Sequence, residues 1–159
     1  MSTDRTDLLA SLHPVTRVLR RIEEVAAARE EMSMWQYALL SVVADGAGRN
    51  QREIAEHLGY SPNRVVTDLH DLERRGYLTR RPGADRRANT LDLTEAGDAV
   101  RRRIRAEIHA REDELLSGLA GDEREHLVVT LGRLAELART AAGPASPRPR
   151  RGVTPPRRA

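Results

Sequence analysis

The stretch QREIAEHLGYSPNRVVTDLHDLERRGYL, residues 51–78, decides the fold of this chain. Asn50 just before it and Glu53 three residues later form an N-terminal capping pattern, which predicts the start of a helix. Gly59 suits the left-handed conformation that ends a helix, and Ser61 suits the cap of the next one. Two short helices joined by a three- or four-residue turn with a glycine are typical of a helix-turn-helix.

The residues that follow this pair of helices predict a β-hairpin. The second helix of the pair is expected to end at Gly76, and residues 77–81 and 90–93 then read as strands. Leu91 and Leu93 alternate with polar residues on the second strand. A helix-turn-helix followed at once by two short strands has the layout of a winged helix. The predicted fold class is therefore mainly α with a small β-hairpin wing.

An apolar stripe near the N-terminus predicts helical structure there as well. Pro14 interrupts the stripe, because proline lacks the amide hydrogen that would bond to residue 10 and clashes with that carbonyl. We therefore expect a short helix to about Leu12, followed by a longer helix with Pro14 in its first turn. The stripe comprises Leu8, Leu12, Val15, Leu19, Ile22 and Ala26.

Three more helices are expected from caps and periodicity. Ser33 and Gln36 form a capping box for a helix that should end near Gly46, and Thr94 can cap a fifth helix. The fifth helix carries the stripe Val100, Ile104, Ile108, Leu115 and Leu119, and the sixth carries Leu127, Leu131, Leu134 and Ala138. These stripes lack enough partners in one chain, so a two-fold dimer would bury them; a self-contained helical hairpin is the alternative.

Composition excludes several classes of protein. The chain has no cysteine, which excludes disulfides, zinc–thiolate sites and thiol nucleophiles. No apolar run is long enough to span a membrane, and residues 1–10 lack the apolar centre of a signal peptide. We therefore expect a cytoplasmic protein.

Net charge is less informative than local clustering. The formal charge is +3, but residues 144–159 contain five arginines and no acid, so the rest of the chain is slightly acidic. Residues 74–87, in contrast, contain six arginines and one acid, Asp85. Such a run is usually only a solvated face, but its position in a hairpin beside a helix-turn-helix suggests DNA phosphate as the partner.

The second helix of the predicted pair has two distinct faces. At about 100° per residue, Val65, Leu69 and Leu72 fall on one side and are expected to pack inward. The opposite side carries Asn63, Thr67 and Arg74, flanked by Arg64, His70 and Asp71. Polar residues on most helices are only solvated, whereas here they lie where base edges are read. Asn63 and Arg64 are the best candidates for base contact.

Catalysis has little support in the sequence. The five histidines form no metal-binding pair four residues apart on a helix, and no glycine-rich phosphate loop follows a strand. We therefore expect no enzyme activity, no metal and no cofactor.

Four segments in order resemble the MarR family of bacterial winged-helix transcription regulators. They are QREIAEHLG (51–59), LERRGYL (72–78), DRR (85–87) and LDLTEAG (91–97). The resemblance implies a homodimer whose first and last helices intertwine. It further implies recognition helices in the major groove of a pseudo-palindromic operator and wing tips in the minor groove.

The resemblance also assigns residues of the wing and identifies one departure. Asp85 and Arg87 match the family's D-x-R motif, in which the arginine enters the minor groove and the aspartate orders the loop. Arg86, at the variable middle position, is expected to meet phosphate. Asp68 occupies a position where the family usually has an aliphatic residue, so its effect is left open.

On this basis residues 1–142 are expected to form one MarR-like domain. Its DNA-binding lobe spans about 33–94, and its dimerisation helices span about 4–30 and 95–142. The tail, residues 143–159, contains five prolines and five arginines and is expected to be disordered, either attracting DNA weakly or only aiding solubility.

The function expected from these observations is that of a homodimeric repressor of transcription that a small aromatic or phenolic effector releases from double-stranded DNA. The alternative is a winged-helix module that binds proteins and no specific DNA. The expected DNA-binding residues are Gln51, Ser61, Asn63, Arg64, Thr67, Arg74, Asp85, Arg86 and Arg87. The expected effector-binding residues are His13, Arg17, Trp35 and Tyr37, although Trp35 and Tyr37, each taken singly, are more often core or interface residues.

Overall fold

A computed structural model describes residues 7–46, 50–82 and 89–142 of this chain. The chain forms two compact units, Met1–Gly118 and Leu119–Ala159. The described elements of the first unit are α1 (Leu8–Ala28), α2 (Met34–Ala44), α3 (Gln51–Leu58), α4 (Pro62–Arg74), β1 (Leu78–Pro82), β2 (Asn89–Leu93) and α5 (Glu95–Leu116). The second unit contains α6 (Gly121–Ala142).

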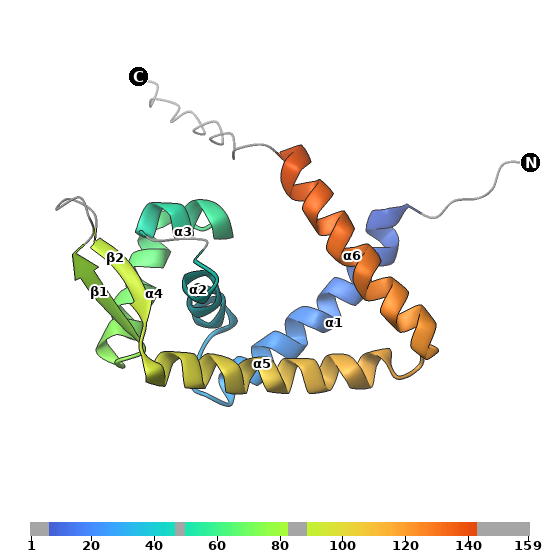
Figure 1. Ribbon diagram of the computed structural model, residues 1–159, viewed down its shortest axis with the longest axis horizontal. Helices are drawn as coiled ribbons and strands as arrows, with labels where there is room; N and C mark the ends of the chain where they lie inside the picture. The colour runs from blue at the N-terminus through green and yellow to red at the C-terminus, as the bar shows by residue number, and fades with distance from the viewer. Residues whose placement is uncertain (1–6, 47–49, 83–88, 143–159) are drawn as a thin grey trace, which may run out of the picture. The chain divides into compact units, whose positions relative to one another are not determined.

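The first unit is built around the long helix α5. Figure 1 shows α2, α3, α4 and the hairpin grouped around the N-terminal end of α5, and α1 packs along the same helix. This is the predicted class of fold, a mainly helical chain with one antiparallel hairpin.

The helix α1 corrects the expectation of a break at Pro14. It runs without interruption from Leu8 to Ala28 with Pro14 inside it. Proline removes one backbone hydrogen bond and crowds one carbonyl. Here that cost falls within the first two turns, where the flanking side chains are exposed, and the rest of the helix keeps its bonds. The packing of Ala26 and Ala27, both buried, holds the other end in place.

The caps of α2 and α5 are as the sequence predicted. Ser33 Oγ accepts from the Gln36 amide at 3.1 Å, and the Gln36 side chain accepts from the Ser33 amide at 3.0 Å. Thr94 Oγ1 accepts from the Gly97 amide at 3.0 Å and donates to the Gly76 carbonyl at 2.7 Å. Thr94 therefore both starts α5 and ties it to the turn after α4.

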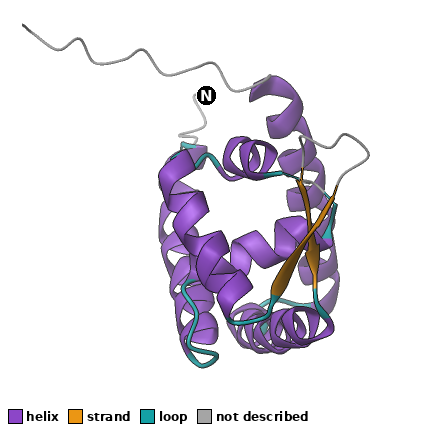
Figure 2. Ribbon diagram, turned by 90° about the vertical axis from the view of Figure 1, so that its left-hand side faces the viewer, coloured by secondary structure: helices purple, strands orange, loops and turns teal. Residues whose placement is uncertain are grey.

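The hairpin pairs β1 and β2 in antiparallel register, with Leu78 opposite Leu93 and Arg80 opposite Leu91. The strands lie beside the helices, as Figure 2 shows in orange. Where the hairpin meets α5, Gly97 lies so close to the Tyr77 carbonyl oxygen that a Cβ at Gly97 would collide with it. This close approach explains why a glycine stands in the first turn of α5.

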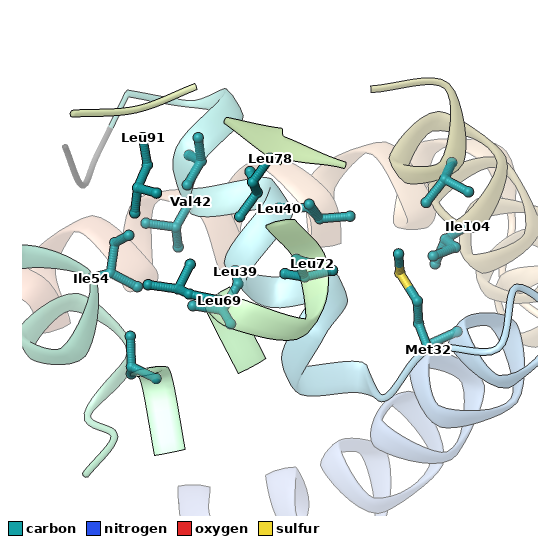
Figure 3. Packing of buried hydrophobic residues seen from close by; sticks show 14 of the residues in the cluster. Met32, Leu39, Leu40, Val42, Ile54, Leu69, Leu72, Leu78, Leu91 and Ile104 are labelled. Atoms are coloured by element: carbon teal, nitrogen blue, oxygen red, sulfur yellow. The ribbon is translucent and has the colours of Figure 1, made fainter. Parts of the chain in front are cut away.

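The core of the first unit draws on every one of its elements. Leu39, Ile54 and Leu69 come from α2, α3 and α4 and point toward one another, as Figure 3 shows. Leu78 and Leu91 close the core on the wing side, and Ile104 continues it along α5. The hairpin and the helix-turn-helix thus share one apolar core, which fixes their relative position.

The apolar residues of α6 have a different environment. Val128, Val129 and Leu137 are more than half exposed, and Leu131 and Leu134 are about 40% exposed. No helix in the described ranges combines the length and apolar character needed to cross a membrane.

Candidate nucleic-acid interface

The first helix of the helix-turn-helix is closed at both ends by the residues that the sequence singled out. Asn50 Oδ1 accepts from the amides of Arg52 at 3.1 Å and Glu53 at 3.0 Å, which caps α3. Gly59 ends α3 with φ 66° and ψ 28°, the left-handed conformation that glycine adopts without strain. The turn therefore has the geometry that a helix-turn-helix requires.

The start of α4 differs in one detail from the prediction. Ser61 is the N-cap residue, but its side chain makes no capping hydrogen bond, so that part of the prediction is wrong. The Ser61 carbonyl accepts from the amides of Arg64 at 3.1 Å and Val65 at 3.3 Å. Pro62, in the first helical position, has a fixed φ suited to a helix, so α4 begins without the side-chain cap.

The helix α4 has the two faces that its periodicity predicted. Val65, Leu69 and Leu72 are fully buried. The exposed side carries four polar residues: Asn63, Thr67, His70 and Arg74. The Thr67 hydroxyl donates to the Asn63 carbonyl at 3.1 Å, while the Asn63 amide group remains on the exposed side. In helix-turn-helix proteins that bind DNA, the exposed face of the second helix lies in the major groove.

Asp71, at the edge of this face, is neutralised by its neighbours. Its carboxylate forms an ion pair with Arg74 and accepts a hydrogen bond from Gln36 Nε2 at 2.9 Å. The guanidinium of Arg75 lies 4.0 Å away. A carboxylate with these partners repels phosphate much less than a free one, because its charge is compensated locally.

Arg64, on the other edge of α4, packs against α2. Its guanidinium carbon lies 5.4 Å from the centroid of the Trp35 ring, and its Nε lies 3.8 Å from Asp68 Oδ2. Trp35 meets Tyr60 edge-on, with ring centroids 4.5 Å apart. Burial, with Asp68 and Glu23 nearby, raises the pKa of Tyr60 to about 12, so its hydroxyl stays protonated.

The arginines at the base of the wing are paired, contrary to the expectation of uncompensated charge. Arg80 forms an ion pair with Glu73 of α4. Arg81 Nε lies 3.1 Å from Asp92 on the facing strand. The two compensating acids, Glu73 and Asp92, lie outside residues 74–87 in the sequence. A count of charges within that segment therefore missed them. Asp85, Arg86 and Arg87, the predicted wing-tip residues, lie outside the described residues.

Arg75 is a structural residue of the interface that the sequence did not single out. Its guanidinium donates to the carbonyls of Glu31 at 2.8 Å and Glu30 at 3.2 Å and lies over the Tyr77 ring at 5.0 Å. Glu31 has a positive φ of 54°, which is uncommon for a residue with a side chain. Arg75 therefore joins the end of α4 to the strained turn between α1 and α2.

The Glu30 carboxylate continues this connection to α5. It accepts two hydrogen bonds from Arg103, at 2.9 Å and 2.8 Å. The bonds from Arg103 hold the pKa of Glu30 below its ordinary value. No local sequence pattern signals these contacts, because they join residues more than forty positions apart.

The remaining predicted site residues lie at several places in the first unit. Gln51, the first residue of α3, is half-buried. His13 and Arg17 are exposed on α1, and Arg17 lines a shallow hollow whose other walls also come from α1. Trp35 and Tyr37 are half-buried on α2, with Tyr37 packed against the core. Trp35 and Tyr37 do not line the hollow at Arg17.

Metal ligation finds no support in the part of the chain that the structure describes. Within those residues, no group of three or more histidine or acidic side chains is placed to hold an ion.

Several solved structures have the same fold as this chain. MarR from E. coli in its apo form is 20% identical, with a TM-score of 0.71 over 82% of this chain and 98% of that one. The M. tuberculosis MarR family protein Rv2887 in complex with DNA is 24% identical, with a TM-score of 0.71 over 82% of this chain and 98% of that one.

A third structure is that of a ligand complex. CouR from Rhodococcus jostii RHA1 bound to p-coumaroyl-CoA is 24% identical, with a TM-score of 0.66 over 85% of this chain and 96% of that one. Rv2887 has also been solved in complex with p-aminosalicylic acid. These likenesses extend over almost the whole length of each protein.

A helix-turn-helix with an exposed polar face on its second helix, and a hairpin packed beside it, defines a winged-helix protein. The model of the MarR family matches residues 31–88, which include α2, α3, α4 and β1. In this segment the chain is similar to the MarR family of transcription regulators, and its fold is that of the solved MarR structures.

Proposed function

We propose that this protein is a homodimeric repressor that binds a specific DNA operator and is released by a small aromatic effector. The observation that carries the DNA-binding part is the exposed face of α4, with Asn63, Thr67, His70 and Arg74 side by side. The face lies on the second helix of a helix-turn-helix, where neutral amide and charged guanidinium groups can read base edges. The DNA complex of Rv2887, which shares the fold, supports the same use of this surface.

The homodimer is supported by the apolar residues that one chain leaves exposed. Leu8, Leu9, Val15 and Val18 on α1 are more than 40% exposed, as are most of the large apolar residues of α6. Contiguous apolar surface of this kind is typical of an interface, and a two-fold dimer lets identical surfaces cover one another. Sedimentation at micromolar concentration should give a dimer, and a monomer would contradict this part of the proposal.

The effector is supported by the ligand complexes of Rv2887 and CouR, which contain p-aminosalicylic acid and p-coumaroyl-CoA. The predicted contacts are His13, Arg17, Trp35 and Tyr37. A protein–operator complex is titrated with salicylate and hydroxycinnamate compounds. If the effector belongs to this class of compounds, at least one of them should dissociate the protein from the operator. Release that is equal for all compounds and for benzoate would argue against a specific site.

DNA binding is tested with the upstream region of the protein's own coding sequence. Saturable binding that resists competitor DNA supports the proposal, whereas no binding at low salt supports the alternative of a protein-interaction module. Asn63→Ala should cost about 1–3 kcal/mol on the preferred duplex and little on a scrambled one, because it removes a neutral base-reading group. Thr130→Ala, a neutral change on the exposed surface of α6, is the matched control.

The wing contributes a second, charge-dependent part of this test. If Arg87 enters the minor groove as the family resemblance implies, Arg87→Ala should weaken binding to all duplexes and reduce the salt slope by about one unit. Unchanged affinity of the folded variant would remove the wing from the interface. The sense of regulation is tested by a reporter fused to the operator, whose expression should rise when the gene is deleted.

A further inference from the structure

The surroundings of Arg64 suggest a role for Asp68, which lies four residues further along α4. Arg64 is the third residue of α4, two positions after Pro62, and so lies near the N-terminal end of the helix. In a helix-turn-helix this is the end whose side chains contact base edges. Its guanidinium lies over the Trp35 ring, and 55% of its side chain is exposed. The group is therefore held on one side by the protein and open to solvent on the other.

The Trp35 ring is held in place by its own neighbours, so it can restrain the guanidinium of Arg64 that lies over it. Its ring meets Tyr60 at an interplanar angle of 83°, the edge-on arrangement that aromatic pairs favour. It stands two residues after Ser33, whose capping box with Gln36 fixes the first turn of α2. A guanidinium stacked on such a ring loses freedom without giving up its hydrogen-bond donors.

Asp68 supplies the second restraint on Arg64. Its Oδ2 is enclosed and accepts no hydrogen bond from any described residue, and only 18% of the side chain is exposed. Burial raises the pKa of the Asp68 carboxyl, the nearby Arg64 lowers it, and Asp71 raises it further. The ionised carboxylate is thus poorly compensated, and its ion pair with Arg64 is long, with 3.8 Å between Arg64 Nε and Asp68 Oδ2.

An arginine at the edge of a recognition helix can reach either phosphate or base edges. Phosphate contacts add affinity for any sequence, whereas base contacts discriminate among sequences. A carboxylate beside the guanidinium weakens its attraction to phosphate, and a stacked ring fixes its plane. Both effects act against the non-specific contact.

We propose that Asp68 and Trp35 restrain Arg64 so that Asp68 lowers affinity for DNA in general and raises discrimination in favour of the operator. This inference rests on the proposed DNA-binding function. Asp68 is then a specificity-determining residue that acts through Arg64 and need not touch DNA.

The test compares Asp68→Asn with the unmodified protein on operator and scrambled duplexes at several salt concentrations. Asn keeps the size of the side chain and removes its charge. Affinity for the scrambled duplex should rise about threefold to tenfold, the ratio of operator to scrambled affinity should fall, and the salt slope should steepen by about one unit. Asp68→Glu, which keeps the charge, should retain most of the discrimination.

A double-mutant cycle isolates the interaction with Arg64. In an Arg64→Ala background, Asp68→Asn should change neither the salt slope nor the ratio of affinities, because the restrained group is gone. Glu136→Gln is the matched control, since it also removes one negative charge from an ion pair on a helix, here the exposed pair with Arg139 on α6. The inference is overturned if Asp68→Asn changes the salt slope and the ratio of affinities no more than this control does. It is also overturned if Asp68→Asn changes them by the same amount in the Arg64→Ala background.

The single tryptophan provides a measurement that does not need DNA. Trp35 is the only tryptophan in the chain, so its fluorescence reports on the ring beneath Arg64. Arg64→Ala and Asp68→Asn should both change its emission or its quenching by iodide, and Glu136→Gln should change neither. Unchanged fluorescence in Arg64→Ala would show that the stacking itself is absent.

The outcomes separate the two proposals. If the unmodified protein binds no specific DNA, the proposed function fails, and this inference fails with it even if the fluorescence confirms the stacking. If specific binding is intact but Asp68→Asn leaves discrimination unchanged in a folded protein, only this inference fails.

Discussion

The winged-helix lobe and the helix α6 differ in how far their apolar side chains are buried. In the lobe, Leu39, Ile54 and Leu69 are fully buried by their neighbours in the same chain. On α6, Val128 is 57% exposed and Leu137 is 67% exposed. The lobe buries these side chains through its own contacts, whereas the large apolar side chains of α6 remain largely exposed.

This contrast has a physical reason. A side chain gains stability only when its apolar area leaves water, at roughly 25 cal/mol per Å². The lobe meets that condition within one chain, and its position for DNA reading is fixed by its own core. The exposed apolar residues of α6 would meet the condition in the proposed dimer, so folding and dimerisation are expected to depend on different residues.

The largest effect is expected from a cavity in the lobe. Leu69→Ala should lower the free energy of unfolding by about 2–5 kcal/mol, because Leu69 is fully buried between α2, α3 and α4. Leu137→Ala, on the exposed side of α6, should change the free energy of unfolding of the monomer by less than about 0.5 kcal/mol, so both variants are compared at a concentration at which the protein is monomeric. Urea unfolding followed by circular dichroism measures both, and equal losses would remove the contrast between the two regions.

A glycine in each region sharpens the comparison further. Gly97→Ala should destabilise the lobe by about 1–3 kcal/mol, because the new methyl group collides with the Tyr77 carbonyl oxygen. At Gly132, in α6, a Cβ would meet nothing within 4 Å, so Gly132→Ala should stabilise the helix by up to about 1 kcal/mol. Thermal melting of the two variants should therefore shift in opposite directions. A tolerated Gly97→Ala would mean that the hairpin and α5 are not held in such close approach.

Dimerisation is expected to depend on the exposed apolar residues of α6, which are not part of the core of the lobe. Replacing Leu131 and Leu134 with serine should weaken dimerisation by about tenfold or more, since both lie on one face of α6 and lose buried area only in a dimer. Sedimentation over a range of concentrations measures the shift. Circular dichroism of the monomeric variant should still show the lobe's helices, and a fully unfolded variant would show that the lobe depends on the dimer.

The smallest effect concerns acid stability at the connection between the α1–α2 turn and α5. Arg103 holds the pKa of Glu30 below its ordinary value of 4.5. A depressed folded-state pKa stabilises the protein above about pH 4.5, and the stabilisation is lost as pH falls through the lower, folded-state pKa. Glu30→Gln should therefore cost at most about 1 kcal/mol at neutral pH and nothing below that pKa.

Urea unfolding at several pH values checks this expectation. Glu24→Gln, which removes the carboxylate of the exposed Arg21–Glu24 pair, is the control and should show a smaller effect. A Glu30→Gln effect that persists unchanged at low pH would mean that packing of the side chain, and not its charge, is responsible.

Most of the fold could be predicted from the sequence because its signals are local. The caps at Ser33, Asn50 and Thr94 and the left-handed residue Gly59 act within a few positions of one helix end. The two faces of α4 follow from periodicity alone, since its buried leucines recur every three or four residues. For the same reason the exposed polar face could be predicted, and with it the candidate DNA-reading surface.

Only the tertiary structure decided the contacts that join distant segments. Pro14 stays within α1 because the cost of one lost bond is local, while the packing that keeps the helix intact comes from elsewhere. Arg75 bonds to the turn at Glu30, and Arg64 lies over Trp35 with Asp68 beside it, through approaches that no spacing along the chain encodes. The arginines of the wing base lost their apparent excess charge in the same way, because Glu73 lies on another element of the fold. Caps and helical periodicity depend on neighbours in sequence, but compensation of charge depends on neighbours in space, and packing alone determines those.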